Sequence, residues 1–149
     1  MILSAQTIRK LKPITPFHER TKEFGMSYGL SAAGYDIRIA EDTNVMFENF
    51  CLASSLEHFN MPDDVLAYVK DKSTWARQGL AVQNTVIEPG WKGYLTLELT
   101  NHSYKILELK KGMPIAQIIF HRLDFATEQP YEGKYQNQQA GAQLPLFEK

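Results

Sequence analysis

The sequence predicts a single all-β domain of the sandwich or barrel type. About seven segments show the two-residue alternation of short strands, or are rich in β-branched and aromatic residues, and turn residues separate them at intervals of about ten. A helical pattern is confined to the N-terminus. At 149 residues the chain has the size of one domain. We therefore expect one unit over residues 1–149.

The first element is a short helix. Ser4 is of the type that caps a helix N-terminus, and Ile8 and Leu11 follow at helical spacing before Pro13, which predicts a helix over residues 4–11. Residues 12–30 contain two prolines and two glycines, so we expect loop or edge structure there.

Strands are predicted from Tyr35 onwards. In Tyr35–Ile39 the isoleucines alternate with Asp36 and Arg38, which is typical of a strand with one buried face. Turn-forming residues separate the strands that follow. These further strands are predicted over residues 45–52, 65–70, 80–84, 94–100, 105–109 and 115–123.

The C-terminal segment differs from the rest in composition. From Thr127 the chain becomes polar and rich in glutamine. Such a segment is usually mobile or lies against a neighbouring surface. We expect residues 127–149 to be a tail, either mobile or closing over a ligand site.

Charge and composition exclude several classes of function. Lys and Arg total 16 against 17 Asp and Glu, a net charge of −1, so no extended surface for polymeric nucleic acid or membrane is expected. The N-terminus lacks the pattern of a signal peptide, and no apolar run reaches the ~18 residues of a membrane span. With a single cysteine, these features predict a cytoplasmic protein.

Common catalytic motifs are also missing from the sequence. Zinc-dependent base deaminases need an H-x-E and a P-C-x-x-C motif, whereas this chain has one cysteine and four histidines outside such a context. Motifs for P-loops, hydrolase elbows and dinucleotide sites are missing too. Zinc catalysis is therefore not expected.

Two features remain as candidates for chemistry. Ser73 and Thr74, flanked by Lys72 and Arg77, could offer hydroxyl groups, backbone N–H groups and positive charge to phosphates, although the same pair is an ordinary helix N-cap. Glu98 shares a strand face with hydroxyl residues. It is either a solvated strand residue or, if a neighbouring subunit covers that face and raises its pKa, a proton-transfer group.

The stretch Asp71–Asn101 resembles the central motif of dCTP deaminases, the zinc-independent deaminases of the dUTPase-like superfamily. The resemblance lies in residues 71–77, 87–93 and 97–101. Four further regions extend it over most of the chain in the same order: residues 33–36, residues 52–57 with 62–64, residues 112–117 and residues 134–139.

This resemblance implies a dUTPase-like distorted β-barrel, of the β-clip or jelly-roll type, with a short N-terminal helix. It implies a homotrimer with sites at subunit interfaces. The implied reaction is the hydrolytic deamination of dCTP to dUTP and ammonia, which feeds the dUMP and dTTP pathway. Mg²⁺ would be bound with the nucleotide triphosphate, and the protein itself would hold no metal directly.

The resemblance also implies roles for individual residues. Glu98 would act as general base and proton shuttle, with Arg77 beside the attacking water and Ser73 completing the catalytic set. The main chain at Thr96, Leu97 and Glu98 would read the pyrimidine. The remaining nucleotide-binding positions are Lys72, Ser73 and Thr74 at the phosphates, Glu88 at the sugar, and Gln117, Tyr131, Lys134 and Gln138 closing over the ligand.

Two departures keep alternatives open. The segment between Thr85 and Glu88 is shorter than expected for a deaminase, and Glu88 stands where the family has Asp. The short segment is similar to dUTPases, so dUTP diphosphatase activity, alone or combined with deamination, is the main alternative. A nucleotide-binding regulator without turnover is a third possibility.

Overall fold

The computed structural model describes residues 1–148. Two short helices, α1 (Ala5–Leu11) and α2 (Ser73–Ala76), accompany twelve strands in these residues. The strands are β1 (Ile14–Thr15), β2 (Thr21–Glu23), β3 (Met26–Leu30), β4 (Tyr35–Arg38), β5 (Thr43–Val45), β6 (Asn49–Asn60), β7 (Val65–Asp71), β8 (Leu80–Val82), β9 (Val86–Ile87), β10 (Lys92–Asn101), β11 (Leu107–Leu109) and β12 (Pro114–Arg122).

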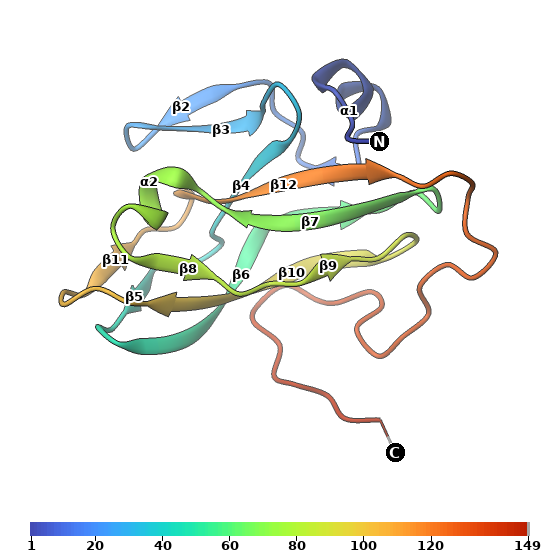
Figure 1. Cartoon of the computed structure of the whole chain (residues 1–149). Coiled ribbons are helices and arrows are strands. Elements are labelled where there is room, and N and C mark those ends of the chain that lie inside the picture. The colour runs from blue at the N-terminus through green and yellow to red at the C-terminus, as the bar shows by residue number, and fades with distance from the viewer. Residues whose placement is uncertain (149) are drawn as a thin grey trace.

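The strands form three antiparallel sheets. The largest has the order β2-β3-β4-β12-β7-β9, the second the order β1-β6-β10-β8, and β11 pairs with β5. Figure 1 shows β12 and β7 running above β8, β9 and β10, with α1, β2 and β3 at the top. Apolar side chains from both larger sheets meet in one core, so the prediction of an all-β domain is confirmed.

The predicted helix is confirmed within one residue. Ser4 occupies the N-cap position, and its carbonyl accepts the Thr7 and Ile8 N–H groups, although its side chain caps no backbone N–H. The helix ends at Lys12, which adopts a left-handed conformation and donates its N–H to the Ile8 carbonyl. Ile8 is buried and fixes this short helix to the core.

The prediction that residues 12–30 are loop or edge structure holds for β1 and β2, which lie at sheet edges, and is wrong for β3, which lies inside the large sheet. Residues 12–30 contain β1 and the hairpin β2–β3, and Phe24 and Gly25 at its turn have φ values of 52° and 71°. Two adjacent residues with positive φ are typical of the tight turns that match the twist of a hairpin. All three residues of β2 are exposed, so this strand lacked the alternation that sequence patterns detect.

Two strand predictions also need correction. Residues 45–52 are not one strand, because Val45 ends β5 and a separate strand, β6, runs from Asn49 to Asn60. The second half of β6 buries Ser54, Ser55 and Glu57, whose polar side chains hid the strand from a search for apolar alternation.

The second strand prediction that needs correction is the one for residues 35–39, because β4 is buried on both faces and not on one. Arg38 donates from its backbone N–H and Nε to the two carboxylate oxygens of Glu57, at 2.8 and 2.7 Å. Its guanidinium also lies 4.5 Å from the centre of the Tyr28 ring. The polar face of β4 is therefore covered by partners from β3 and β6.

The C-terminal segment forms no helix or strand in residues 127–148. It follows the lower edge of the molecule beside β10 (Figure 1) and pairs with that strand through a single bridge from Gln138 to Gly93. No helix within residues 1–148 has the length and apolar character needed to span a bilayer.

Candidate active site

The segment from Asp71 to Arg77 connects β7 to β8 and contains α2. Trp75 is buried and its indole N–H donates to the Pro114 carbonyl at 2.8 Å, which fixes α2 against β12. This anchor leaves Ser73, Thr74 and Arg77 on the exposed side of the turn. The predicted Ser-Thr turn is therefore a one-turn helix that presents its hydroxyl groups outward.

Lys72 lies just before this helix and is buried. Its ammonium donates to Asp36 Oδ2 at 2.9 Å, and both side chains are about nine-tenths buried. Burial raises the pKa of the Asp36 carboxyl, and the hydrogen bond and charge of Lys72 oppose that rise. Lys72 is thus held in place by a partner on β4.

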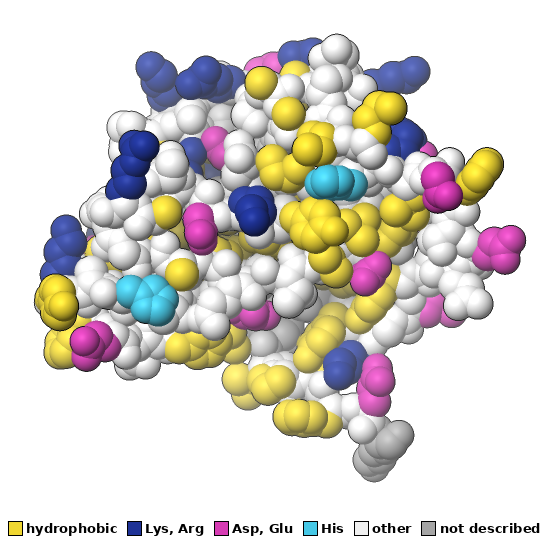
Figure 2. Space-filling view, in the orientation of Figure 1, with side chains coloured by type: hydrophobic (Ala, Val, Ile, Leu, Met, Phe, Trp, Pro, Cys, Tyr) yellow, Lys and Arg dark blue, Asp and Glu magenta, His cyan; other side chains and the backbone are white. Residues whose placement is uncertain are grey.

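A cavity of about 510 Å³ opens beside this ion pair. Its polar lining consists of Ser73 and Gln117, the cations Lys72, Arg9 and Arg20, and the carboxylates Glu19, Asp36 and Asp71. Lys and Arg side chains gather at the top of the molecule over α1, β2 and β3, as Figure 2 shows. Cationic and hydroxyl groups in one hollow are the donors that phosphate oxygens prefer.

A second hollow lies along β10. This cavity, which we call the Glu98 cavity, has a volume of about 520 Å³. Thr96 and Glu98 line it from β10, whereas Leu97 and Leu99 point into the core and are fully buried. The assignment of Leu97 and Leu99 to the core face is therefore confirmed. Leu95, expected on the same face, is instead half-buried and lines the cavity, next to a register shift between Tyr94 and Thr96.

Glu98 is half-buried in the wall of this cavity. Burial raises the pKa of its carboxyl. Among residues 1–148 its carboxylate has no hydrogen bond or ion pair that would offset this effect. An unpartnered carboxylate with a raised pKa, facing a cavity, is the kind of group that accepts and returns a proton near neutral pH.

The backbone at the same place is held by a side chain. Asn84 Nδ2 donates to the Thr96 carbonyl at 2.6 Å, and Asn84 Oδ1 accepts the Glu98 N–H at 2.9 Å. The predicted strand 80–84 ends at Val82, two residues early. Gln83 makes one more backbone hydrogen bond to β10, and at Asn84 the side chain replaces the backbone in contact with that strand.

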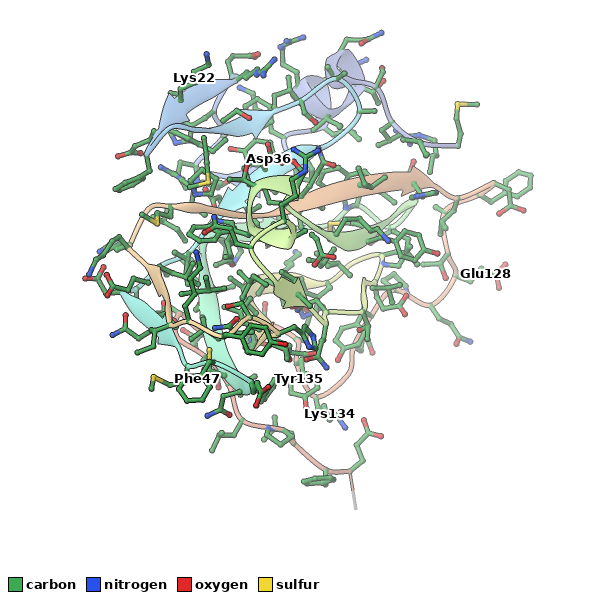
Figure 3. All side chains as sticks on the ribbon, turned by 60° about the vertical axis from the view of Figure 1, so that its left-hand side comes forward. Lys22, Asp36, Phe47, Glu128, Lys134 and Tyr135 are labelled. Atoms are coloured by element: carbon green, nitrogen blue, oxygen red, sulfur yellow. The ribbon has the colours of Figure 1, made fainter. Side chains whose placement is uncertain are left out.

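The C-terminal segment covers the Glu98 cavity. The Gln138 carbonyl accepts the Tyr94 N–H at 3.0 Å, and the Gln138 side chain donates to the Thr96 hydroxyl. The Gln143 N–H donates to the same hydroxyl at 3.0 Å. Figure 3 shows Tyr135 and Lys134 of this segment at the lower edge, far from Asp36 above. Within one chain the tail therefore contacts this face at Tyr94 and Thr96, and the expected cover by a neighbouring subunit stays a prediction.

The comparisons with known proteins agree with this architecture. The model of the family described as dCTP deaminase-like matches residues 36–123. A dCTP deaminase of Campylobacter concisus is 35% identical over 179 aligned residues, covering 95% of this chain and 96% of the relative. A dCTP deaminase of Acidobacterium capsulatum is 36% identical and covers 89% of this chain and 90% of the relative. The chain belongs to the dCTP deaminase family.

The solved structures that resemble this dCTP deaminase family member confirm the dUTPase-like fold. A 2'-deoxycytidine 5'-triphosphate deaminase from Agrobacterium tumefaciens superimposes with a TM-score of 0.66 at 16% identity, covering 81% of this chain and 48% of that one. EIAV dUTPase does so with a TM-score of 0.59 at 20% identity, covering 79% and 94%. The alignment with the Campylobacter concisus relative is longer than this chain, so that relative has residues without a counterpart here.

The structure distributes the expected dCTP deaminase residues over two places. Glu98, Thr96, Glu88, Tyr131 and Gln138 line the Glu98 cavity. The second set, in the cavity beside α2, comprises Lys72, Ser73 and Gln117, while Thr74, Arg77 and Lys134 are exposed and line neither cavity, and Leu97 lies in the core.

Sequence reasoning missed three residues that shape the Glu98 cavity: Asn84, Tyr135 and Gln143. Tyr135 accepts the Trp91 indole N–H through its carbonyl at 2.7 Å, which ties the tail to the loop before β10. A signal existed only for Asn84, because asparagine is disfavoured in strands and favoured where a strand breaks off.

Proposed function

We propose that this member of the dCTP deaminase family hydrolyses dCTP to dUTP and ammonia. The chain is an enzyme of this family, a hydrolase, by its similarity to curated members across nearly the whole chain. The observation that carries the proposal at the level of the site is Glu98, a carboxylate with a raised pKa and no partner within residues 1–148, in a nucleotide-sized cavity.

Glu98 takes a proton from the water that attacks C4 of the cytosine and passes it to the departing amine. A base with a pKa moved towards neutrality is suited to both transfers, because it can accept and release the proton at the same pH. The main chain at Thr96 and Glu98 reads the edge of the pyrimidine, and Gln138 and Tyr131 close over the nucleotide. The water attacks where the tail excludes bulk solvent.

The triphosphate is bound by the groups around α2. Lys72, Ser73, Thr74 and Arg77 supply cations and hydroxyl donors, and Gln117 lies beside them. The nearby carboxylates Asp36 and Glu19 are engaged by Lys72 and Arg9. No group of three His, Cys, Asp or Glu side chains in residues 1–148 is placed to hold a metal ion. This donor set fits Mg²⁺ carried by the triphosphate, where it neutralises phosphate charge.

A homotrimer with sites between subunits explains why these groups lie apart. In one chain the Glu98 cavity and the cavity beside α2 share no lining residue. A nucleotide that contacts both Glu98 and Arg77 needs the two surfaces brought together. Assembly of identical chains achieves this, with the base in the Glu98 cavity of one subunit and the phosphates on Ser73 and Arg77 of its neighbour.

Release of diphosphate from dUTP is the second candidate function. Glu88 lines the same cavity as Glu98 and is exposed, so a second carboxylate faces the ligand. It could orient a water towards the phosphates. This activity would occur alone or follow deamination in the same site.

Product analysis tests the proposal. The purified protein is incubated with Mg²⁺ and either dCTP or dUTP, and ammonia, dUTP, dUMP and diphosphate are quantified. Ammonia with dUTP from dCTP supports deamination, and ammonia with dUMP supports the bifunctional form. Formation of dUMP from dUTP without ammonia from dCTP would replace the proposal by a dUTP diphosphatase. Nucleotide-dependent thermal stabilisation without any product would indicate a regulator.

A further inference from the structure

The edge of β10 that faces the Glu98 cavity presents one hydrogen-bond acceptor beside one donor. In an antiparallel strand the main-chain groups of residues two apart point to the same side. β8 pairs with β10 only between Leu99 and Asn101, and one further bond joins the Gln83 N–H to the Glu98 carbonyl at 2.8 Å. The next two groups along this edge are the Glu98 N–H and the Thr96 carbonyl, and no backbone group in residues 1–148 pairs with them.

Asn84 satisfies both groups with its side chain. Its carboxamide spans the pair, at 2.9 Å to the Glu98 N–H and 2.6 Å to the Thr96 carbonyl. Only one orientation of the amide fits, because Oδ1 cannot donate and Nδ2 cannot accept. Asn84 itself is half-buried and lines the Glu98 cavity. The contact is therefore made at the ligand-facing side of the strand.

A pyrimidine base carries the same pair of groups on one edge. Cytosine has an amino donor beside the N3 acceptor, and uracil has the N3–H donor beside a carbonyl acceptor. Either pair matches a strand edge that offers C=O and N–H two residues apart, as a carboxamide does. The Asn84 amide and a bound base therefore compete for the same two backbone groups.

We propose that Asn84 is an internal placeholder for the base: its carboxamide holds the reading edge of β10 and is displaced when the pyrimidine docks. The inference rests on the proposed function, because that function puts the base on this edge. The ligand binds only to the fraction of molecules in which the edge is open, so Asn84 weakens the apparent affinity of the protein for the ligand. Two hydrogen bonds of ordinary net strength favour the form in which Asn84 occupies the edge over the open form by a factor on the order of ten.

The placeholder also determines specificity. A base that offers the donor and acceptor pair recovers both hydrogen bonds that Asn84 gives up. A ligand without that pair must open the edge and leave the Thr96 carbonyl and the Glu98 N–H unpaired in a half-buried place. Asn84 therefore penalises mismatched ligands, although it makes no contact with a correctly bound base.

The test measures affinity in Asn84→Ala and Asn84→Leu. Calorimetric titration uses α,β-imido-dUTP, which has the uracil edge, no amine to lose and no oxygen bridge between its first two phosphates. Base-free 2-deoxyribose 5-triphosphate serves as the second ligand. Both variants are expected to bind the imido nucleotide about tenfold more tightly than the parent protein and the base-free ligand with unchanged affinity.

Gln83→Ala is the matched control. Gln83 precedes Asn84 and its side chain contacts the Thr100 hydroxyl, away from the reading edge. Its replacement should leave both affinities unchanged. The leucine variant keeps the approximate shape of asparagine, so thermal unfolding of the two Asn84 variants separates loss of the amide from loss of the fold.

Three outcomes would overturn the proposal. Weaker binding in folded Asn84 variants would mean that the amide contacts the base itself. Unchanged binding would mean that the base does not use this edge, and a lack of binding by all forms would mean the same. Ammonia release from dCTP by the parent protein is measured separately. If the parent protein deaminates dCTP but the Asn84 variants bind with unchanged affinity, only the placeholder role is refuted. If the variants bind more tightly but the parent protein releases no ammonia, only the proposed reaction is refuted.

Discussion

Replacement of Glu98 by glutamine separates proton transfer from every other role of this residue. Glutamine has nearly the same size and shape, and the Glu98 N–H that Asn84 contacts belongs to the backbone and is unchanged. Within residues 1–148 the carboxylate makes no hydrogen bond or ion pair, so no contact is broken by the substitution. We expect Glu98→Gln to fold and to bind nucleotide.

The expected loss in kcat follows from the role assigned to the carboxylate. A positioned general base contributes roughly 10²- to 10⁴-fold to the rate, equivalent to about 3 to 5 kcal/mol in the barrier. Because burial raises the pKa of Glu98, its basicity at neutral pH exceeds that of an exposed glutamate. The loss should therefore lie in the upper part of this range, with KM little changed.

The assay is ammonia release from dCTP between about pH 4 and pH 9. In the parent protein kcat/KM should fall on the acid side as Glu98 takes up a proton, at a pH above the usual range of glutamate because its pKa is raised. Glu88→Gln, which changes an exposed carboxylate of the same cavity, should keep this acid limb. Full activity of Glu98→Gln, or an unaltered acid limb in it, would refute the reasoning.

Three further predictions concern stability. Glu57→Ala leaves the buried Arg38 without its ion-pair partner and should lower the free energy of unfolding in urea by about 3 to 5 kcal/mol. Glu19→Ala removes an exposed ion pair with Arg9 and should leave the urea midpoint unchanged. Trp75→Phe loses its hydrogen bond to β12 and should cost about 1 to 3 kcal/mol by the same measurement. Because the folded-state pKa of Glu98 is raised, protonation favours the native state, and this contribution is lost as pH rises. Glu98→Gln should thus melt higher than the parent at pH 7 and equally at pH 4.

The alternation of apolar and polar residues predicted correctly those strand faces whose buried side chains need only an apolar core and no particular partner. In residues 94–100 any apolar core would bury Leu97 and Leu99, and the structure does so. The same reasoning failed for β4, whose polar residues are buried because specific partners reach them. Lys72 covers Asp36 from 36 residues away, and Glu57 reaches Arg38 from 19 residues away. Alternation within a strand contains no information about such distant partners.

The candidate site shows the same division. Its motif residues could be selected from the sequence because they occur at family spacing within one stretch. The surroundings of Glu98 could not be predicted from the sequence, because the residues that contact this face, Gln138 and Gln143, lie about forty residues further along the chain. The role of Asn84 also escaped sequence reasoning, because it depends on which backbone groups of β10 are left unpaired when β8 ends.

The charges of the two cavities bear on how the site is completed. The Glu98 cavity contains the proton acceptor, the base-reading edge and the tail, but its lining includes no Lys or Arg. A triphosphate bound there needs several cations, because its charge cannot be neutralised by hydroxyl and amide groups alone. Lys72, Arg9 and Arg20 lie in the other cavity, where Asp36 pairs with Lys72 and Glu19 with Arg9, and Asp71 is a third carboxylate. Glu98 thus has its raised pKa within one chain, whereas under the proposed trimer the phosphates would be held by the cavity beside α2 of a second copy.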